Sequence, residues 1–570
     1  MKPSTSLRAQ LLRGLRAVDA RTLAVSGLAL LIFFAAIVLP SVLAPTAILL
    51  LGVEFAWSAY RVLRYRGERT ELRLGADALA RVVVVGAVCV AAAPLGGWVL
   101  VVGLVVGLLT LLEQALRLPV ETALPMAANI DGVDVPVPSI GLANAFHLVN
   151  VATAVTLALS LIPGVPAIIA AVLAVASLAL AAAMSFQAVR YLYRRTRFEA
   201  KLPGLMKKLA PQFAFHWHAP RGTAYQAAMW LPYLDRLGVP YFVLVRSRDN
   251  FEEVRKLTSA PVILRLRLED LDPIVCPSLK AVFYTNTAVR NSHMIRFPHL
   301  RHIQLNHGDS DKITSVSPTF RQYDKNFVAG QAAIDRFALH NVAILPEQMV
   351  IVGRPQLEKV VPATTGIDQI TAPRVLYTPT WSGFYDDSDY SSLRGGRQLV
   401  EKLLERGCTV VFRPHPYARL KSINAEACKQ IIEMLTQDGL TSGRQHVFGP
   451  KAETEWSVID CFNGCDAMIT DVSSVASDFL IANKPFAMAA VSSHGDDFVA
   501  SFPLTKAAYV FDVAKDGSTS GLDETLDALL GADPKAEERR SIRRYYLGDI
   551  EPQDCVAHFV SQARAALAEA

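Results

Sequence analysis

The chain has 570 residues and a formal net charge of +5. That length exceeds what one compact core usually holds, so several domains are expected. The composition is 52% hydrophobic and only 19% charged, with a mean hydropathy of +0.29, which favours a chain that lies partly in lipid. The C-terminal half has no compact basic block with interleaved aromatic residues, so nucleic-acid binding is unsupported. The seven cysteines are scattered, which fits a reducing compartment and provides no zinc-site spacing.

Apolar runs fill most of residues 22–188 and predict a multi-span α-helical membrane region. Six candidate spans cover about 22–39, 43–62, 78–96, 98–116, 147–163 and 165–187. Basic residues flank these spans in the N-terminal segment 1–21, in the break at 61–69 and in the linker 189–210. By the positive-inside rule these flanks are cytoplasmic. The sequence therefore predicts a multi-pass protein of the cell membrane, in contact with membrane lipids, whose soluble part lies on the cytoplasmic face.

Two alternatives for this region stay open. Residues 117–146 would also be cytoplasmic in a six-span topology, yet they hold Glu121, Asp131 and Asp134 against Arg117 alone. Four spans would keep both ends of the region inside as well. The apolar runs could instead be buried helices of a large soluble protein, but they hold almost no ionisable residues and their basic flanks alternate as a topology requires. For the same reason the sequence indicates no ion or proton pathway.

After about residue 200, short β-rich runs alternate with helical patterns. We expect eleven strands, at 241–247, 261–267, 281–286, 301–306, 325–330, 349–353, 374–380, 409–414, 467–471, 485–491 and 508–513. Near-continuous apolar strands with intervening helices predict parallel sheets covered on both faces. Eleven strands are too many for one doubly wound sheet. We therefore expect two Rossmann-like domains, 211–356 and 374–570, joined by the polar linker 357–373 with its two prolines.

Polar clusters follow several strands, at the edge where such sheets bind ligands. In "TDVSS" (470–474), Ser473 and Ser474 lie where the start of a helix favours phosphate, although ordinary capping by Asp471 or Ser473 explains the same residues. In "RPHP" (413–416), Arg413 offers a fork suited to phosphate.

His415 of "RPHP" could donate a hydrogen bond to a phosphate or a leaving oxygen, or could simply bond to a carbonyl group in a loop. Thr378 and Thr380 of "YTPTW" (377–381) follow a further strand and add two hydroxyl groups to the same edge.

The segment "NHGDSDK" (306–312) follows the strand at 301–306. It offers His307 as a general base, with Asp309 or Asp311 to orient the imidazole. The alternative is a polar turn that ends in a surface lysine, Lys312.

Two weaker patterns suggest metal binding. Asp387 and Asp389 form a DxD sequence, which one class of glycosyltransferase uses for metals, but it lies in a polar loop. His216 and His218 of "FHWH" have strand spacing, and nothing nearby in the sequence completes a site. No metal is therefore expected.

Taken together, these clusters resemble the CDP-glycerol:poly(glycerophosphate) glycerophosphotransferase family, the teichoic-acid type transferases. The resemblance runs from about residue 213 toward the C-terminus and rests on the ordered set "MWLPYL" (229–234), 282–312, "VGRPQLEK" (352–359), "YTPTW", "FRPHP" and "TDVSSVASDF". It implies the GT-B-like arrangement of two Rossmann-type domains, with the acceptor on the first domain and the nucleotide donor mainly on the second.

By this resemblance, His307 matches the family's proposed base and His415 its second essential histidine, while Ser473 and Ser474 match residues that hold donor phosphate. The implied reaction transfers an alditol phosphate from CDP-glycerol or a related CDP-alditol to a lipid-linked or polymer acceptor, with release of CMP. Thr378, Thr380 and Lys312 complete the expected phosphate-binding set.

The membrane region departs from the family members that attach only peripherally. Two alternatives remain: a GT-B glycosyltransferase that uses a nucleotide sugar, and a transporter or scaffold with a nucleotide-binding domain.

Overall fold

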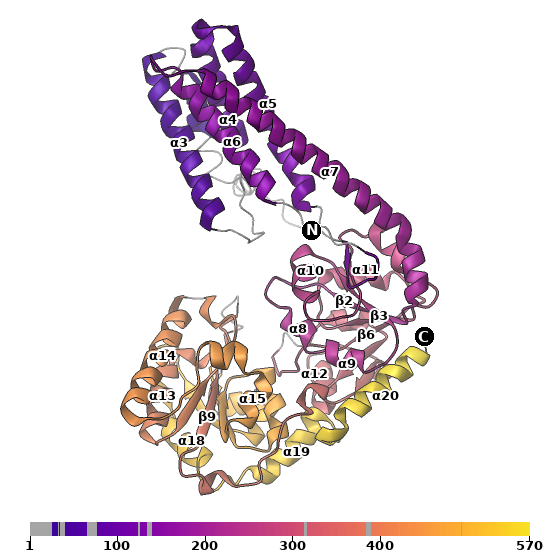
Figure 1. Cartoon of the computed structure of the whole chain (residues 1–570). Helices are drawn as coiled ribbons and strands as arrows, with labels where there is room; N and C mark the ends of the chain where they lie inside the picture. The colour runs from indigo at the N-terminus through magenta and orange to yellow at the C-terminus, as the bar shows by residue number, and fades with distance from the viewer. Residues whose placement is uncertain are drawn as a thin grey trace, which may run out of the picture. The chain divides into compact units, whose positions relative to one another are not determined.

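The computed structural model describes residues 26–31, 33–34, 40–64, 77–122, 126–133, 140–312, 316–383, 389–420, 422–491 and 493–569. The chain divides into two compact units, Met1–Pro203 and Gly204–Ala570. Figure 1 shows helices in the first unit and two sheets with covering helices in the second. An apolar α-helical region followed by α/β sheets, as expected from the sequence, is therefore confirmed.

The first unit is built from long apolar helices. They are α3 (Pro40–Arg64), α4 (Ala78–Ala92), α5 (Gly97–Thr122), α6 (Ile140–Leu159) and α7 (Ile168–Leu209), with the short elements η1 (Ala93–Leu95) and β1 (Ala127–Ala128). Four helical stretches are long and apolar enough to cross a membrane: Leu43–Arg64, Ala78–Leu95, Gly141–Leu159 and Ile168–Leu209. Gly97–Glu113 is a shorter apolar stretch, and the span expected at about 22–39 lies largely outside the described residues.

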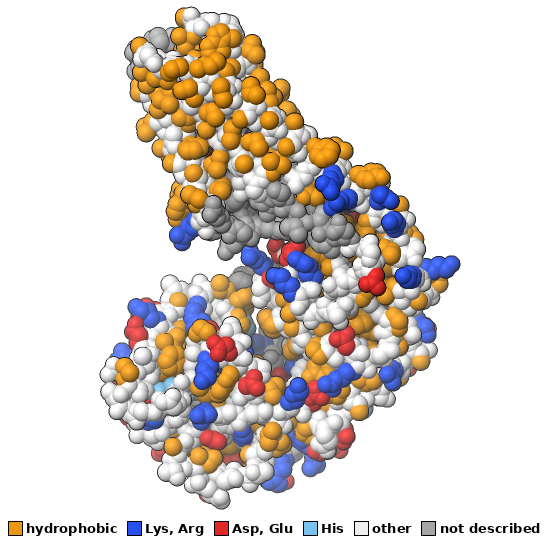
Figure 2. Space-filling view, viewed as in Figure 1, with side chains coloured by type: hydrophobic (Ala, Val, Ile, Leu, Met, Phe, Trp, Pro, Cys, Tyr) orange, Lys and Arg blue, Asp and Glu red, His pale blue; other side chains and the backbone are white. Residues whose placement is uncertain are grey.

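Apolar side chains cover the outside of this unit (Figure 2). Leu104 is 73% exposed and Phe186 is 71% exposed. A soluble protein rarely leaves so much contiguous apolar surface in water, so this surface is suited to lipid. Residues 189–210, expected as a linker, form the C-terminal part of helix α7.

A buried ionic network joins four of these helices. Arg81 of α4 is 1% exposed and pairs with Glu54 of α3 at 2.5 Å and with Glu113 of α5 at 2.9 Å. Glu113 also contacts His147 of α6, whose Nε2 lies 3.0 Å from Ser58 Oγ. The charges are few, but the fold gathers them in one place, where each neutralises another in an apolar surround.

The first sheet of the second unit is parallel throughout. Its strands are β2 (Phe213–Trp217), β3 (Tyr241–Val245), β4 (Val262–Leu264), β5 (Ala281–Tyr284), β6 (Arg301–Gln304), β7 (Lys325–Val328) and β8 (Met349–Ile351). They lie in the order β4-β3-β2-β5-β6-β7-β8, so β2 is central. All five side chains of β2 are buried, including His216, as expected for a strand covered on both faces.

The connections of this sheet contain short helices. They are α8 (Tyr225–Ala228), α9 (Leu231–Asp235), α10 (Arg248–Val254), η2 (Glu269–Ile274), η3 (Val289–Asn291), α11 (Ser292–Ile295), η5 (Pro318–Gln322), α12 (Gln331–Leu339) and η6 (Pro346–Gln348). The segment that leads to the second sheet holds η7 (Pro355–Leu357) and η8 (Ile367–Gln369).

The second sheet is β9 (Arg374–Thr378), β10 (Thr409–Phe412), β11 (Ala467–Thr470), β12 (Phe486–Ala490), β13 (Tyr509–Val513) and β14 (Thr519–Ser520). The order is β10-β9-β11-β12-β13-β14, and only the β13–β14 pair is antiparallel. Its connections hold η10 (Ser392–Arg394), α13 (Gly396–Glu405), η11 (Ala418–Leu420), α14 (Ser422–Ser442), η12 (Lys451–Glu455), α15 (Val458–Asn463), α16 (Ser474–Phe479), η13 (Leu480–Ala482), α17 (Gly495–Ser501), η14 (Pro503–Ala507) and α18 (Leu522–Leu529).

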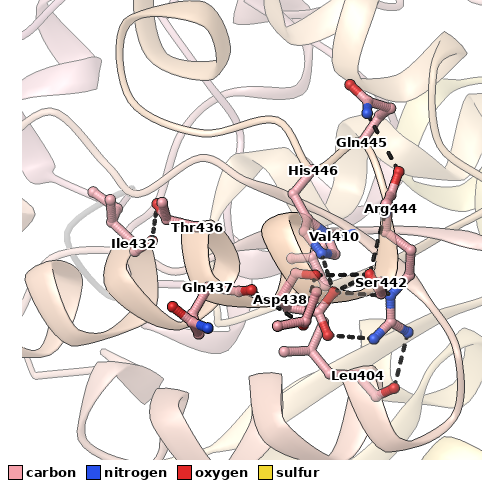
Figure 3. Close-up of polar contacts among 12 residues, drawn as sticks. Leu404, Val410, Ile432, Thr436, Gln437, Asp438, Ser442, Arg444, Gln445 and His446 are labelled. Atoms are coloured by element: carbon pink, nitrogen blue, oxygen red, sulfur yellow. Dashed lines mark hydrogen bonds and ion pairs between the residues drawn. The ribbon is translucent and has the colours of Figure 1, made fainter.

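An ionic cluster fastens the end of α14 to the edge strand β10 (Figure 3). The carboxylate of Asp438 accepts hydrogen bonds from Arg444, Ser442 and His446, and His446 Nδ1 in turn accepts from the Val410 amide at 3.0 Å. Burial alone would raise the pKa of Asp438, but the hydrogen bonds from Arg444, His446 and Ser442 lower it to about 2. The cluster therefore closes one edge of the second sheet.

The C-terminal helices α19 (Ala536–Leu547) and α20 (Cys555–Ala568), separated by η15 (Pro552–Asp554), return to the first sheet. The Phe559 ring of α20 packs 5.3 Å from that of Trp230 and 6.2 Å from that of Phe327. Arg564 donates to the Leu237 carbonyl at 3.0 Å. Part of the segment 374–570 therefore supports the first sheet, although the sequence analysis assigns that whole segment to the second domain.

Candidate functional site

The loop after β6 is shaped by a left-handed residue. Asn306 has φ +60°, and its carbonyl accepts hydrogen bonds from Trp230 Nε1 at 2.5 Å and from Thr285 Oγ1 at 2.9 Å. Asparagine tolerates this backbone conformation better than most residues. The two hydrogen bonds hold the turn, so the next residue, His307, is presented at the carboxyl edge of the sheet.

His307 has a defined tautomer. Its Nδ1 lies 2.9 Å from the Thr285 carbonyl oxygen, which can only accept, so Nδ1 carries the proton and Nε2 is left with a free lone pair. The His307 side chain is exposed to solvent. Desolvation by the neighbouring protein lowers the pKa of His307, and so does the positive charge of Arg354, whereas the hydrogen bond to Thr285 raises it. A neutral imidazole with an accessible lone pair has the form that a general base needs.

The sequence predicted that Asp309 or Asp311 orients His307, but in the structure both carboxylates have other partners. Asp309 Oδ1 and Asp311 Oδ1 both accept from the guanidinium of Arg336 in α12, the second at 3.0 Å. Asp311 Oδ2 accepts from Tyr546 Oη in α19 at 2.6 Å. The two carboxylates tie the loop to neighbouring helices, and the carbonyl of Thr285 takes the orienting role.

The His307 loop lies directly on the start of α16. A Cβ built on Gly308 would lie 2.8 Å from Ser474 Oγ, which is closer than real Cβ atoms come. Ser477 Oγ donates to the Asp309 carbonyl at 2.7 Å. Gly308 is therefore required by a close approach between the end of the first sheet and a helix of the second.

Two further polar contacts join the same elements. Arg354, which follows β8, forms a bidentate pair with Asp478 of α16 at 2.9 and 3.0 Å. Lys312 Nζ donates to Thr380 Oγ1 at 3.1 Å. The structure thus brings His307, Lys312, Thr380 and Ser474 together from sequence segments more than 60 residues apart.

Helix α16 begins without a side-chain cap. Ser473 occupies the N-cap position, but its side chain makes no capping hydrogen bond and its buried Oγ has no partner among the described residues. Asp471, the other candidate cap, accepts instead from the amides of Thr380 at 2.7 Å and Ser392 at 3.2 Å. Capping therefore does not account for these residues, and the free N–H groups of the helix start are left for a ligand.

The charge of Asp471 is reduced by its surroundings. Burial raises the pKa of Asp471 to about 7, against the hydrogen bonds from Ser392 and Thr380 and the positive charge of Lys312. A carboxyl group that is partly protonated near neutral pH repels a bound anion less than an ionised one does. The same burial lowers the pKa of Lys312 to about 8, although Asp471 and Asp389 raise it. Lys312 Nζ also lies 5.2 Å from the centre of the Tyr390 ring.

His415 has the opposite tautomer to His307. The amide of Tyr417 donates to His415 Nδ1 at 3.0 Å, so the proton of the neutral ring lies on Nε2. The ring stacks on Trp381, with centroids 6.1 Å apart. Burial, together with the charge of Lys312, lowers the pKa of His415 to about 4. His415 is therefore a neutral hydrogen-bond donor across the physiological range, suited to an oxygen that gains negative charge.

The remaining predicted residues lie elsewhere or serve the fold. Arg413 Nη1 donates to the carbonyls of Ala452 and Trp456, the second at 2.8 Å, so this nitrogen is bonded to the backbone. Thr378 is buried, and its carbonyl accepts from Thr470 Oγ1 at 3.0 Å.

The structure describes part of the two patterns considered for metals. Asp389 of the DxD sequence pairs with Arg394, and Asp387 lies outside the described residues. His216 of "FHWH" is buried in β2, at 1% exposure. Within the described ranges, no group of three or more His, Cys, Asp or Glu side chains is placed to hold a metal.

Sequence reasoning missed several residues that hold the site together. They are Trp230, Arg336, Arg354, Asp478 and Tyr546. Arg354 and Asp478 lie within the quoted segments "VGRPQLEK" and "TDVSSVASDF", but their pairing needed the tertiary structure. Tyr546 had no local signal, because it reaches the loop from a C-terminal helix.

The fold and site together define a two-sheet protein whose polar groups gather where the carboxyl edge of one parallel sheet meets a helix start of the other, an arrangement that suits a phosphate-containing ligand. Residues 354–494 match the CDP-Glycerol:Poly(glycerophosphate) glycerophosphotransferase family. The resemblance seen in the motifs is thus confirmed over that range, which includes His415, Ser473 and Ser474 but not His307. This segment of the chain is therefore similar to the glycerophosphotransferases, the family of the teichoic-acid type transferases.

Comparison with solved structures gives further likenesses at low identity. A putative UDP-N-acetylglucosamine 2-epimerase from Listeria monocytogenes is 11% identical, with a TM-score of 0.42, over 63% of this chain and 98% of its own. The wall teichoic acid polymerase TagF soaked with CDPG is 12% identical, with a TM-score of 0.42, over 68% and 97%. MnaA of S. aureus with UDP is 12% identical, with a TM-score of 0.42, over 63% and 97%. No curated protein matches the chain.

Proposed function

We propose that this protein transfers an alditol phosphate from a CDP-activated donor, such as CDP-glycerol, to a hydroxyl group of a lipid-linked or polymer acceptor and releases CMP. The single observation that carries the proposal is the close approach of the His307 loop to the start of α16, seen at Gly308 and Ser474. That approach supports the proposal, because direct transfer between acceptor and donor requires a base close to the groups that bind the donor phosphate.

In the proposed step, His307 Nε2 accepts the proton of the acceptor hydroxyl. The resulting oxygen attacks the β-phosphorus of the donor, an O–P bond forms, and the bond from that phosphorus to the bridging oxygen breaks. CMP leaves with the electron pair of the broken bond. The protonated His307 is held in place by its bond to Thr285 and returns its proton to solvent after product release.

Four groups support the proposed stabilisation of charge on the phosphates. His415 Nε2 and the Ser473 and Ser474 hydroxyls are neutral donors, and Lys312 supplies positive charge. The free amides of the α16 start add to them. Arg413 is left out of this set, because its described hydrogen bonds go to backbone carbonyls.

The apolar helices suit an anchor that keeps the transferase beside a membrane-bound acceptor. We propose that long apolar stretches of the first unit anchor it in the cell membrane, with the sheets on the cytoplasmic side, where CDP-activated donors are made. The basic side chains in the C-terminal part of α7 favour this orientation. A reporter fused after Lys208 tests it, since the proposal requires a cytoplasmic signal and an external signal contradicts it.

A donor panel tests the reaction itself. The full-length protein in detergent is incubated with CDP-glycerol, CDP-ribitol and UDP-sugars, with and without an oligo(glycerol phosphate) acceptor, and free CMP or UDP is measured. The proposal predicts acceptor-dependent release of CMP. Release of UDP from a sugar nucleotide would favour a glycosyltransferase instead, and release of neither would leave a nucleotide-binding scaffold or transporter.

A further inference from the structure

A group of basic side chains lies at the carboxyl edge of the first sheet, outside the site described above. Arg246 directly follows β3 and His218 directly follows β2. Arg290 lies in η3 and His293 in α11, both of which follow β5. We call these four residues the cationic cluster.

Hydrogen bonds hold the cluster together. Arg246 Nε donates to the Arg265 carbonyl at 2.7 Å, and Nη2 donates to His293 Nδ1 at 3.1 Å. Arg290 Nη1 donates to the Arg246 carbonyl. His293 therefore accepts at Nδ1 and keeps its proton on Nε2, so the outer members of the cluster present donors.

The centre of the cluster is buried and incompletely bonded. The Arg246 side chain is fully buried, and its Nη1 has no hydrogen-bond partner among the described residues. Such a guanidinium normally has a partner for every nitrogen when it is taken out of water. Arg290, His218 and His293 are half-buried, so the cluster can be reached from solvent.

Among the described residues, no carboxylate forms an ion pair with Arg246 or Arg290. Two nearby carboxylates pair with other arginines, Glu269 with Arg267 and Asp272 with Arg296. Burial and then repulsion from Arg290 lower the pKa of Arg246 to about 10, against the weak attraction of Asp270. Burial and the same arginines lower the pKa of His218 to about 4. Arg246 and Arg290, which lie together without a paired carboxylate in the described structure, form with the two neutral histidines a site that an anion would complete.

The cluster adjoins the candidate base through two consecutive residues. Thr285 accepts the hydrogen bond of His307, and the side chain of the next residue, Asn286, donates to the His218 carbonyl at 3.0 Å. An acceptor built from alditol phosphate units carries a phosphodiester close to its terminal hydroxyl. An acceptor primed on a lipid diphosphate presents the same phosphate chemistry.

We propose that the cationic cluster binds a phosphate group of the acceptor and thereby positions the acceptor hydroxyl at His307. This inference rests on the proposed transferase function for the identity of the ligand. The anion site itself stands on the contacts and burial of the cluster.

The main test measures binding without catalysis. Titration of full-length protein with inorganic phosphate, by calorimetry in saturating CDP so that the donor site is filled, should detect one site. Arg290→Gln should weaken this binding by about tenfold or more, because hydrogen bonds to a charged group are lost. Arg290→Lys should restore part of it. The matched control Arg267→Gln removes the same charge from an exposed arginine at the same edge and should change phosphate affinity little.

The second test identifies the source of the phosphate. The KM of two acceptors, an oligo(glycerol phosphate) and an isoprenyl diphosphate in micelles, is measured for Arg290→Gln, along with the affinity for CDP. A rise of about tenfold in the KM of one acceptor, with unchanged affinity for CDP, supports the proposal and names the phosphate that binds. Equal effects on CDP and acceptor would overturn it.

The outcomes also separate the two proposals of this work. Unchanged phosphate binding in Arg290→Gln would refute the anion site even if CMP release is found. Arg246 and Arg290 would then only stabilise the loops. Weakened phosphate binding without CMP release from any donor keeps the anion site and removes the transferase.

Discussion

Replacing both Ser473 and Ser474 by alanine should weaken donor binding without weakening the fold. Ser473 Oγ is buried with no partner in the described structure, and neither it nor Asp471 caps α16 with its side chain. Each hydroxyl that bonds a charged phosphate contributes about 1.5–3 kcal/mol, and the start of α16 offers two. We expect the affinity for CDP-glycerol to fall by at least about 1.5 kcal/mol, or roughly tenfold.

The double variant should not lose the stability that a protein loses when a helix cap is removed. Removing a capping serine costs about 1 kcal/mol, whereas removing a buried hydroxyl with no partner costs nothing or stabilises. Ser457 provides the matched control, because its Oγ accepts from the Asp460 amide at 3.1 Å in a true capping box of α15. Ser457→Ala should lower the melting temperature and leave donor affinity unchanged. Calorimetric titration and thermal unfolding of both variants decide, and a less stable double variant with normal donor affinity would refute the phosphate assignment.

Three further perturbations test other parts of the structure. Lys312 loses its charge as the pH rises through its lowered pKa of about 8, so kcat/KM for the donor should fall above that pH in the wild type. Lys312→Arg should remove this alkaline fall, and an identical pH profile in the variant would exclude Lys312 as its cause. Arg81→Met breaks the buried ionic network of the first unit and should destabilise the protein by about 3–5 kcal/mol in thermal unfolding. The control Arg190→Met, on the exposed surface of α7, should change the stability little. Equal effects of the two variants would show that the network adds no stability. The folded-state pKa of Asp438, about 2, lies below its ordinary value, so the contribution of Asp438 to stability is present above pH 4 and is lost as the pH falls toward 2. In Asp438→Asn, the unfolding free energy should therefore fall less steeply between pH 4 and pH 2 than in the wild type. An unchanged pH dependence would contradict the role of the cluster.

The strand pattern was predictable because each strand is short, apolar and bounded by turn residues. All eleven expected strands occur, each ending within a few residues of its predicted boundary. The central strand β2 was not among them, since His216 interrupts its apolar run, and only the fold shows that this histidine is buried with its neighbours. Burial of a polar residue on a covered sheet is a tertiary effect that local sequence does not encode.

The site was predictable in its members more than in its bonds. Placement at the carboxyl ends of parallel strands was enough to select His307, Lys312, Thr380 and Ser474, which the fold brings together. The partner of His307 was expected to be an aspartate two or four residues away, but it is the carbonyl of Thr285. A backbone carbonyl carries no sequence signal, so this bond could not have been foreseen.

Ion pairs between residues far apart in the sequence could not be predicted either. Arg336 takes both aspartates of the loop, and Arg81 gathers two glutamates from separate apolar helices. In the sequence nothing links Arg336 to the two aspartates of the loop, and single charges in apolar helices look negligible. The fold decides their partners, which is why the helical region appeared almost uncharged beforehand.

The central claim is that His307 removes a proton from the acceptor hydroxyl, and one variant tests it most directly. Steady-state CMP release by full-length His307→Ala, with CDP-glycerol as donor and oligo(glycerol phosphate) as acceptor, should fall by about 10²–10⁴-fold. Donor affinity and melting temperature should change little, because the ring lies open to solvent at a loop and, in the proposed step, acts on the acceptor hydroxyl and not on the cytidine. Normal turnover in a folded His307→Ala protein would contradict the account, since no positioned base would then be needed at that loop.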